Sequence, residues 1–197
     1  MKVYFLRHGQ TDMNFQHRFQ GWTNTELNDT GKAQASAVHE EIEKRGISFD
    51  RVFVSPLKRA VTTAELATGC SSDGFVLDER IKEIMLGDYE LKSYEELGEE
   101  FIDIFFHHPQ DYVVAGGESF YDLLDRTGAF LKDLAAEEEE EKTVLVVSHG
   151  AAIHAMLANI LYPDDRLTGL KKFWDIKVDN CTLLELSLEN GAFRLCE

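Results

Sequence analysis

Three short apolar runs, each followed at once by polar or charged residues, most constrain how this chain can fold. They are residues 3–6, 52–54 and 144–147. Apolar runs of this length, bounded by turn signals, are typical of strands that are covered on both faces. Segments with helical periodicity lie between them, as in chains that build a parallel sheet. We therefore predict an α/β protein with a mostly parallel central sheet.

The helices between these runs have recognisable ends. Thr30 is expected to cap the first helix, which stops at Gly46 after two basic residues. In the next helix, Ser55 is expected to be the cap and Pro56 to occupy the first helical position. Arg59 then falls in the first turn of a helix that begins where a strand ends.

Two further helices are predicted in the middle of the chain. Ser93 with Glu96 forms a capping-box pattern, and the helical spacing continues to His108, where Pro109 ends it. Ser119 caps the second helix, which has a regular apolar face and runs into an acidic stretch at residues 137–141. That stretch is expected to be a solvated helix end.

Outside these elements the pattern is weaker. Residues 75–77 are a weaker strand candidate. Residues 12–27 show neither helical nor strand periodicity and are expected to form a loop. The tail alternates or runs apolar through 173–178, 182–188 and 193–195, with Asn190-Gly191 as a hairpin turn. We expect added strands here, at least one of them antiparallel at an edge of the sheet.

The charge of the chain limits its partners. Its 197 residues include 20 basic and 36 acidic side chains, a formal net charge of -16. This field would repel nucleic acids and anionic membranes, so a phosphate could be bound only in a local basic pocket. The opening apolar run is too short for a signal peptide and no stretch could span a membrane, which predicts a cytoplasmic protein. The 3 cysteines are expected to be reduced thiols.

The strand ends carry the residues of greatest chemical interest. Arg7 and His8 follow the first run, Arg59 lies just beyond the second, and His149 follows the last. In a parallel sheet these ends lie on one side, together with helix N-termini that present free N–H groups. Two arginines and two histidines are thus predicted to line one crevice. The expected ligand is a phosphoryl group.

Each residue type suits that ligand. The planar guanidinium groups of Arg7 and Arg59 can hold several phosphoryl oxygens at once. Cations nearby disfavour the imidazolium form of His8, which leaves a neutral nitrogen able to attack phosphorus. Glu83, in an irregular segment, is the candidate proton carrier. Read without this context, Arg7 and His8 would equally fit a surface cation and a hydrogen-bonded structural histidine.

Ordered motifs extend over most of the chain. They are Leu6-Arg7-His8-Gly9-Gln10-Thr11 with Asn14, Arg18-Phe19-Gln20-Gly21, Leu27 with Gly31, Gln34 and Ala35, Ser55-Pro56-Leu57-Lys58-Arg59-Ala60, Glu83 with Gly87, Gly116-Gly117-Glu118-Ser119, and Val147-Ser148-His149-Gly150. Together they resemble the histidine phosphatase superfamily, the group that contains cofactor-dependent phosphoglycerate mutases and related phosphatases. Several motifs in order are far more specific than any one of them.

The resemblance implies a role for each central residue. His8 would be the nucleophile that becomes phosphohistidine, while Arg7, Arg59 and His149 would bind the phosphoryl oxygens. Glu83 would protonate the leaving oxygen and then activate water. The implied activity is a phosphomonoesterase that acts on a small soluble phosphate ester and needs neither a cofactor nor a metal.

The resemblance also implies further contacts and an architecture. Asn14, Gln20 and the backbone near Gly21 would be additional phosphate donors, and Thr23 and Ser55 would contact substrate. The implied fold is a three-layer α/β/α sandwich of phosphoglycerate mutase type, with a mostly parallel central sheet and an antiparallel edge strand. We expect a single domain over residues 1–197, with residues 86–119 as a helical lid over the pocket.

One stretch departs from the family pattern. Many relatives have Trp-Glu-Gly where this chain has Tyr89-Glu90-Leu91, so Leu91 is expected to alter the turn beside Glu83 and the substrate preference. Tyr89 itself is at least as well explained as a packing aromatic residue.

The remaining histidines are not predicted to be catalytic. His17 is expected to face solvent, and His154 to lie in the core or on the surface. His107 and His108 are adjacent and lack the i, i+4 spacing of a helical metal pair.

Alternative functions remain open on the sequence alone. A phosphoglycerate mutase would use the same pocket but return the phosphoryl group to its product. A sensing module that binds phosphate without catalysis would typically have lost the nucleophile or the acid, and this chain has both. A metal hydrolase built from His8, Glu83 and His149 is the weakest alternative. A homodimer is one assembly that the sequence leaves open.

Overall fold

The computed structural model describes residues 1–137 and 141–196. A six-stranded sheet runs through its middle in the order β3-β2-β4-β1-β5-β6. The strands are β1 (Lys2–Arg7), β2 (Arg51–Val54), β3 (Val76–Leu77), β4 (Thr143–Ser148), β5 (Leu183–Glu189) and β6 (Ala192–Leu195). Strands β1 to β4 run parallel to one another, β5 is antiparallel to its neighbour β1, and β6 is antiparallel to β5. The predicted fold class, including its antiparallel edge, is confirmed.

Strand register aligns the ends that carry the candidate residues. In the three central strands Leu6 pairs with Val147, which in turn pairs with Val54. Just beyond them, the backbone N–H groups of His8 and Ser55 donate to the carbonyls of Ser148 and Val147, both at 3.0 Å. The carboxyl ends of the three strands are therefore aligned at one edge of the sheet.

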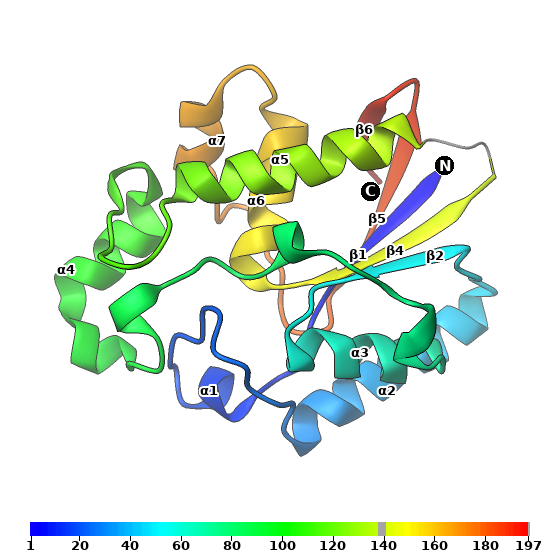
Figure 1. Ribbon diagram of the computed structural model, residues 1–197, viewed down its shortest axis with the longest axis horizontal. Helices are drawn as coiled ribbons and strands as arrows, with labels where there is room; N and C mark the ends of the chain where they lie inside the picture. Colours follow the sequence, from blue (N-terminus) through cyan, green and yellow to red (C-terminus); the bar gives the residue numbers. More distant parts are fainter. Residues whose placement is uncertain (138–140, 197) are drawn as a thin grey trace.

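Helices cover both faces of the sheet, as Figure 1 shows. On one face α2 (Asp29–Arg45) and α3 (Lys58–Thr68) pack against Tyr4 and Leu6 of β1. On the other face α5 (Phe120–Ala136) and α6 (Gly150–Leu161) pack against Val3 and Phe5 of the same strand. Alternate side chains of a strand point to opposite faces, so a wholly apolar strand requires two covering layers.

A third apolar cluster lies beyond the strand ends. It is built around α4 (Tyr94–His107), at the end of the molecule opposite the chain termini in Figure 1, with α7 (Arg166–Lys171) nearby. Gly98 (φ 81°) interrupts the helical geometry of α4. The short helices are α1 (Asp12–Phe15), η1 (Ser72–Gly74), η2 (Glu79–Ile81), η3 (Gly87–Tyr89) and η4 (Pro109–Asp111).

Several predicted boundaries are confirmed. Ser93 and Ser119 each form a capping box, and Gly46 ends α2 in the left-handed conformation. Asn190 (φ 53°) and Gly191 (φ 75°) form the turn between β5 and β6. The acidic run predicted as a solvated helix end lies, at residues 138–140, outside the described residues.

Two predicted helix starts are wrong. The cap of α2 is Asn28, whose side chain accepts from the N–H of Gly31 at 2.8 Å, so Thr30 lies within the first turn. Helix α3 begins at Lys58 rather than Pro56. Ser55 does not cap it, because its hydroxyl contacts the ring of His149 instead.

Two segments were given the wrong secondary structure. The predicted loop at 12–27 includes α1, which the side chain of Thr11 caps. Residues 173–178 form no strand, because the carbonyls of Ile176 and Val178 accept from side chains, not from a neighbouring strand. The stretch is irregular chain in which Phe173 and Val178 are buried.

A close backbone contact holds the loop behind β1. A Cβ atom on Gly31 would lie 2.1 Å from the carbonyl oxygen of Gln10, and one on Gly9 would lie 2.5 Å from the carbonyl oxygen of Gly31. Real Cβ atoms do not approach backbone so closely. The first turn of α2 therefore needs glycine at residue 31 to pack under the residues that follow His8.

We predict that Gly31→Ala destabilises the protein, because the added methyl group meets backbone that cannot rotate away. The expected loss in the free energy of unfolding is about 1–3 kcal/mol, measured by urea denaturation. Gly74→Ala is the matched control, since nothing lies within 4 Å of its added methyl group. It should change stability by less than about 0.5 kcal/mol. Equal effects of the two substitutions would contradict the role given to the contact.

Candidate active site

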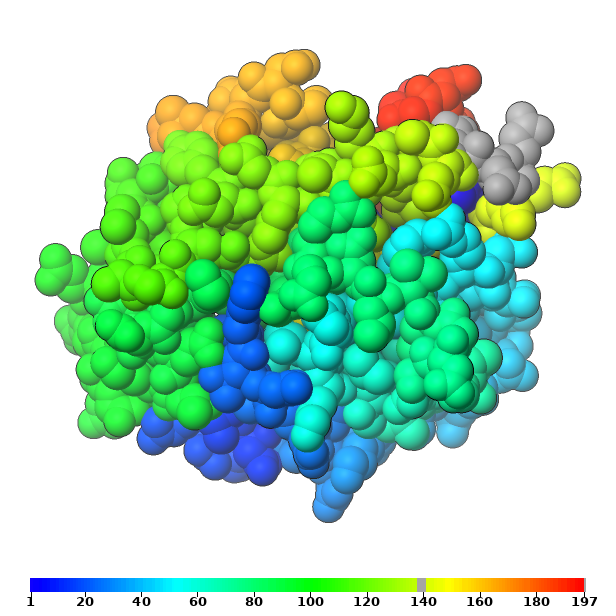
Figure 2. Space-filling view, in the orientation of Figure 1, coloured from blue at the N-terminus to red at the C-terminus, as the bar shows by residue number. Residues whose placement is uncertain are grey.

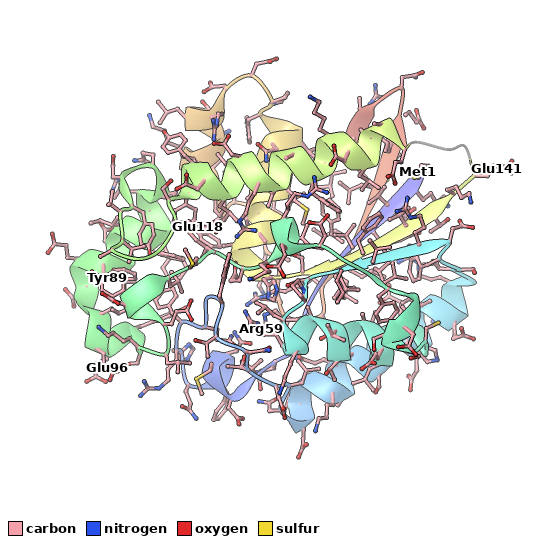
Figure 3. All side chains as sticks on the ribbon, viewed as in Figure 1. Met1, Arg59, Tyr89, Glu96, Glu118 and Glu141 are labelled. Carbon is pink, nitrogen blue, oxygen red and sulfur yellow. The ribbon has the colours of Figure 1, made fainter. Side chains whose placement is uncertain are left out.

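A cavity of about 350 Å³ opens at the carboxyl ends of the strands. Its inner end is lined by polar residues from three separate parts of the chain, namely Arg7, His8, Asn14, Gln20, Gly21, Arg59 and Glu83. In Figure 3, Arg59 lies near the ends of the strands, whereas Tyr89 and Glu96 lie on the side of α4. Of the four residues predicted to line one crevice, Arg7, His8 and Arg59 line this cavity and His149 does not.

His8 lies at the inner end of this cavity with 2% of its surface exposed. Its Nδ1 is 2.7 Å from the carbonyl oxygen of Gly9. A carbonyl oxygen only accepts, so this contact makes Nδ1 the protonated nitrogen and leaves the lone pair on Nε2. The local backbone therefore selects the tautomer in which Nε2 can act as a nucleophile.

Two polar side chains hold the backbone around His8. The buried hydroxyl of Thr63 accepts from the N–H of Gly9 at 3.0 Å and donates to the carbonyl of Arg59 at 2.6 Å. From the other side, Asn180 Nδ2 donates to the carbonyl of His8 at 2.9 Å. The histidine is thus tied both to α3 and to the segment before β5.

Arg59 is fully buried, Arg7 is half-buried, and both are only partly paired. Arg59 donates to the carbonyls of Thr23 and Gly21 at 2.8 Å, and Arg7 donates to the carbonyl of Val178 at 2.7 Å. The Nε atoms of both guanidinium groups are buried and have no protein partner. Burial, with Arg7 adding to it, lowers the pKa of Arg59 to about 10, so its charge is kept at neutral pH. Unpaired buried donors of this kind are suited to an anion.

His149 approaches His8 closely, with 5.1 Å between the ring centroids. It is fully buried, and its Nε2 lies 2.7 Å from Ser55 Oγ. Its Nδ1 is buried without a partner. A serine hydroxyl that donates to Nε2 leaves the proton on Nδ1, which makes Nδ1 a donor for a bound oxygen.

Both histidines are held in the neutral form. Burial lowers the pKa of His8 well below its usual value, and the charges of Arg59 and Arg7 lower it further. The pKa of His149 is lowered in the same way by burial, Arg59 and His8. An unprotonated His8 is what nucleophilic attack requires.

Glu83 lies at the N-terminus of α6. Its Oε1 accepts from the N–H of Ile84 at 2.9 Å, and its two oxygens accept from the N–H groups of Ala151 and Ala152 at 3.3 Å. The carboxyl group is thereby directed to the cavity that it lines with His8. Glu83 thus lines the cavity with His8, and its role as the proton carrier stays a prediction.

Arg126, on α5, clamps the segment that carries Glu83. Its guanidinium group donates to the carbonyls of Arg80 and Lys82 at 2.7 Å and of Glu83 at 2.8 Å. It also pairs with Glu118 at 2.5 Å, in a bridge whose side chains are only 16% and 12% exposed. The indole of Trp22 donates to the carbonyl of Glu83 as well, at 2.7 Å. The position of the carboxyl group thus depends on a buried arginine on a different helix.

The loop after α1 supplies amide groups. The amide oxygen of Gln20 accepts from the hydroxyls of Thr11 at 2.9 Å and Thr25 at 2.6 Å, which leaves its N–H group as the donor for a ligand. The amide oxygen of Asn14 likewise accepts from Thr11. In Figure 2 this loop, in blue, rises between the green surface around α4 and the teal surface of residues near 80.

The carboxylate of Glu90 anchors the same loop. It accepts from the backbone N–H groups of Trp22 at 2.7 Å and Thr23 at 2.8 Å, and from the hydroxyl of Thr23. A Cβ atom on Gly21 (φ 51°) would lie 2.3 Å from a Glu90 oxygen. Glycine is therefore required where this carboxylate crosses the loop.

Three predicted site residues do not line the cavity. His149 and Ser55 lie behind it, in contact with each other, and the hydroxyl of Thr23 contacts Glu90. Ser55 and Thr23 are thus placed to position His149 and the loop. Their roles as substrate contacts, like the other assigned roles, stay predictions.

The turn at Leu91, which was expected to differ from the family pattern, has an unusual backbone conformation. Leu91 adopts a left-handed conformation (φ 63°), which glycine adopts without strain. Its N–H donates to the carbonyl of Phe19 at 2.7 Å, and its own carbonyl accepts from Arg18 at 2.8 Å. The turn therefore carries some backbone strain, and its two hydrogen bonds hold it against Arg18 and Phe19 in the loop beside the cavity.

The other histidines are placed as the sequence indicated. His17, His107 and His108 are exposed. His154 is 5% exposed and lines the cavity, where its ring nitrogens contact the carbonyls of Gly150 at 2.7 Å and Ile176 at 2.9 Å. Among residues 1–137 and 141–196, no three His, Cys, Asp or Glu side chains are grouped to hold a metal ion.

Sequence reasoning missed the residues that hold the site together. Thr63, Glu90, Arg126 and Asn180 touch functional residues that are distant along the chain. Two of them left a signal in the sequence. Glu90 is the residue that this chain shares with the Trp-Glu-Gly pattern of its relatives, and Arg126 is a charged residue beside the apolar face of a predicted helix.

Comparisons with known proteins agree with this geometry. The family model described as histidine phosphatase superfamily (branch 1) matches residues 3–197. Phosphoserine phosphatase 1 of Hydrogenobacter thermophilus is 29% identical over 96% of this chain and 87% of its own length. A protein named probable phosphoglycerate mutase GpmB, from Salmonella choleraesuis, is 33% identical over 98% of this chain and 87% of its own length.

A solved structure shares the whole fold. A variant of the phosphoserine phosphatase from Entamoeba histolytica, in complex with phosphoserine, superposes with a TM-score of 0.80 at 28% identity. The match covers 100% of this chain and 95% of that one. The architecture is therefore that of the histidine phosphatases.

The lowered pKa values of His8 and His149 predict how stability responds to acid. The unfolded chain binds protons at these imidazoles near pH 6.5, whereas the folded chain does not until the pH is much lower. Their contribution to stability is therefore complete above about pH 6.5 and is lost as the pH falls below it. Each histidine should contribute up to about 1.4 kcal/mol per pH unit. Urea denaturation between pH 7.5 and 5.5 measures the total slope.

His149→Gln provides the comparison, because glutamine cannot take up this proton. Its slope of unfolding free energy against pH should be smaller than that of the wild type by up to about 1.4 kcal/mol per unit, with the full difference reached at the acid end of the range. All carboxylates contribute to both proteins alike. Identical slopes would show that His149 is not held neutral by the fold.

Proposed function

The chain belongs to the histidine phosphatase superfamily, and we propose that it hydrolyses small soluble phosphate esters through a phosphohistidine formed on His8. One observation carries the proposal. The Nε2 lone pair of a neutral His8 shares a cavity with Arg7 and Arg59, whose Nε atoms are buried and have no protein partner. A nucleophile surrounded by fixed cations is the arrangement that phosphoryl transfer needs.

The reaction runs in two displacements at phosphorus. In the first, His8 Nε2 forms a bond to phosphorus while the bond to the ester oxygen breaks, and Glu83 gives its proton to that oxygen. In the second, Glu83 takes a proton from water as the water oxygen attacks phosphorus and the N–P bond breaks. Inorganic phosphate leaves, and both residues return to their starting states.

Fixed positive charge stabilises both transition states. Arg7 and Arg59 hold the equatorial oxygens, and His149 Nδ1 donates to one of them. Asn14 and Gln20 add neutral donors at the rim of the phosphate position. These groups supply the charge stabilisation in a mechanism that we propose to be independent of metal ions and cofactors.

The segment 86–119 is proposed to act as a lid. It contains α4, and Leu86, Tyr94, Phe105 and Phe106 from it line the outer part of the cavity. Excluding water there would protect the phosphoenzyme until the alcohol has left.

The cellular setting is proposed from the sequence. No helix in the described ranges is long and apolar enough to cross a membrane. We also propose that the protein lies in the cytoplasm. The homodimer that the sequence leaves open is likewise a proposal from the sequence alone.

A phosphoglycerate mutase is the second candidate, favoured by the similarity to the GpmB protein. Both activities share the phosphohistidine and differ in whether water or a second hydroxyl takes the phosphoryl group. Release of phosphate and isomerisation of phosphoglycerate, measured with and without a bisphosphoglycerate primer, separate them. Primer-dependent isomerisation with negligible phosphate release would overturn the phosphatase.

We predict that quenching in alkaline detergent during turnover traps an acid-labile, base-stable phosphoenzyme in the wild type and none in His8→Ala, because the substitution removes the imidazole nitrogen that forms this bond. Labelled phosphate esters and gel autoradiography provide the measurement. Glu83→Gln should still form the species with an activated aryl phosphate, which needs little protonation, and should lose roughly 100-fold or more in rate with alkyl esters. Absence of both trapping and turnover over a broad panel of esters would favour a sensing module.

We also predict that Arg126→Lys impairs alkyl esters more than an activated aryl phosphate. Lysine cannot donate to three carbonyls and Glu118 together, so Glu83 would lose its position. The expected loss in kcat/KM is roughly 10-fold for alkyl esters and about 2-fold for the aryl ester.

Arg80→Lys is the matched control, since Arg80 lies in the same segment but pairs at the surface with Asp78 and Asp133. It should leave the ratio of the two rates unchanged. Parallel losses for both esters in Arg126→Lys would mean that the clamp serves folding alone.

A further inference from the structure

The outer half of the cavity differs in character from the phosphate end. Its wall is made of aromatic rings contributed by the loop after α1, by α4 and by the segment before β5, namely Phe19, Tyr94, Phe105, Phe106 and Trp174. A phosphoryl group held by Arg7 and Arg59 would direct the alcohol of its ester toward this wall. The composition of the wall therefore bears directly on which alcohol fits.

These rings hold one another in place. Phe19 lies 4.8 Å from both Tyr94 and Phe105 between ring centroids, and Trp174 lies 5.4 Å from Phe106. The indole N–H of Trp174 donates to the carbonyl of Phe105 at 3.2 Å. The one polar atom of this side chain is thus already paired within the wall. A rigid aromatic surface of this kind suits another ring or an apolar chain.

The same half of the cavity offers poor support for a carboxylate. Arg18 pairs with Glu96 at 2.8 Å, and Lys177 pairs with Asp179 at 2.6 Å in water-exposed positions. Both ring nitrogens of His154 contact carbonyl oxygens. Arg18 and Lys177 therefore each already have an acidic neighbour, and Asp179, itself in the lining, would repel a substrate carboxylate.

We propose that this site prefers phosphate monoesters whose alcohol carries an uncharged aromatic ring over esters whose alcohol carries a carboxylate. The proposal rests on the proposed phosphatase function and specifies its substrate class. It also separates this chain from relatives named for phosphoserine, which bears both a carboxylate and an ammonium group.

Three substrates with the same kind of leaving group test the preference. 2-Phenylethyl phosphate, ethyl phosphate and phosphoserine all release a primary alcohol, so differences in kcat/KM report mainly on contacts with the alcohol. Transfer of one phenyl group from water to an apolar surface should favour 2-phenylethyl over ethyl phosphate by roughly 10- to 100-fold. Phosphoserine should be turned over no faster than ethyl phosphate.

Substitutions in the aromatic wall test which of its residues cause the preference for the aromatic ester. Phe106→Ala and Trp174→Ala should each reduce the ratio of 2-phenylethyl to ethyl phosphate by roughly 5-fold or more, and Phe106→Leu should reduce it less because it keeps apolar volume. Phe75→Ala is the matched control, since Phe75 is a partly buried ring that packs against a different apolar cluster. It should leave the ratio unchanged.

A further variant tests the carboxylate argument. If Arg18 held a substrate carboxylate, Arg18→Gln would lower turnover of phosphoserine selectively, and we expect no such selective loss. Phosphoserine turnover that exceeds that of 2-phenylethyl phosphate, with phosphate released from both, would overturn the preference and leave the phosphatase intact. If none of the three esters is hydrolysed and no phosphoenzyme forms, the proposed function fails, and the preference fails with it.

Discussion

The parallel register of β1, β4 and β2 is the constraint on which the rest of the site depends. Since Leu6, Val147 and Val54 are neighbours across the sheet, the residues after them leave from one edge in step. That alignment brings the rings of His8 and His149 to 5.1 Å. It also directs α3, with Arg59, and the N-terminus of α6 to the same point. A shift of two residues in either pairing would separate these groups by more than 6 Å.

Burial at that edge accounts for much of the predicted chemistry. Arg59 and His149 are fully buried, and His8 is almost so. Buried cations beside imidazoles favour the neutral ring, and neutral imidazoles are the form that the proposed attack requires. A phosphoryl dianion would offset the repulsion between the arginines, so the arrangement is most favourable with its substrate bound. The charges proposed to bind phosphate would thus also prepare the proposed nucleophile.

Support for the site comes from residues that do not touch the phosphate position. Glu90 holds the loop of Gln20, Arg126 holds the segment of Glu83, and Thr63 ties Gly9 to α3. Each is a hydrogen bond between parts of the chain more than 40 residues apart. Nothing in local periodicity or motif spacing specifies such partners. The same limit explains why residues 173–178 were mistaken for a strand, because an apolar run records burial and not which groups pair with its backbone.

The sequence by itself determined the α/β class, the antiparallel edge, the family, and the polar residues at the strand ends. These follow from hydrophobic period, turn chemistry and motifs, all of which are local. Only the tertiary structure decided that Ser55 faces His149 instead of capping α3, that Arg126 positions Glu83, and that five aromatic rings from distant segments form one wall. Such contacts depend on how packed elements meet in space, which a pattern along one chain does not record.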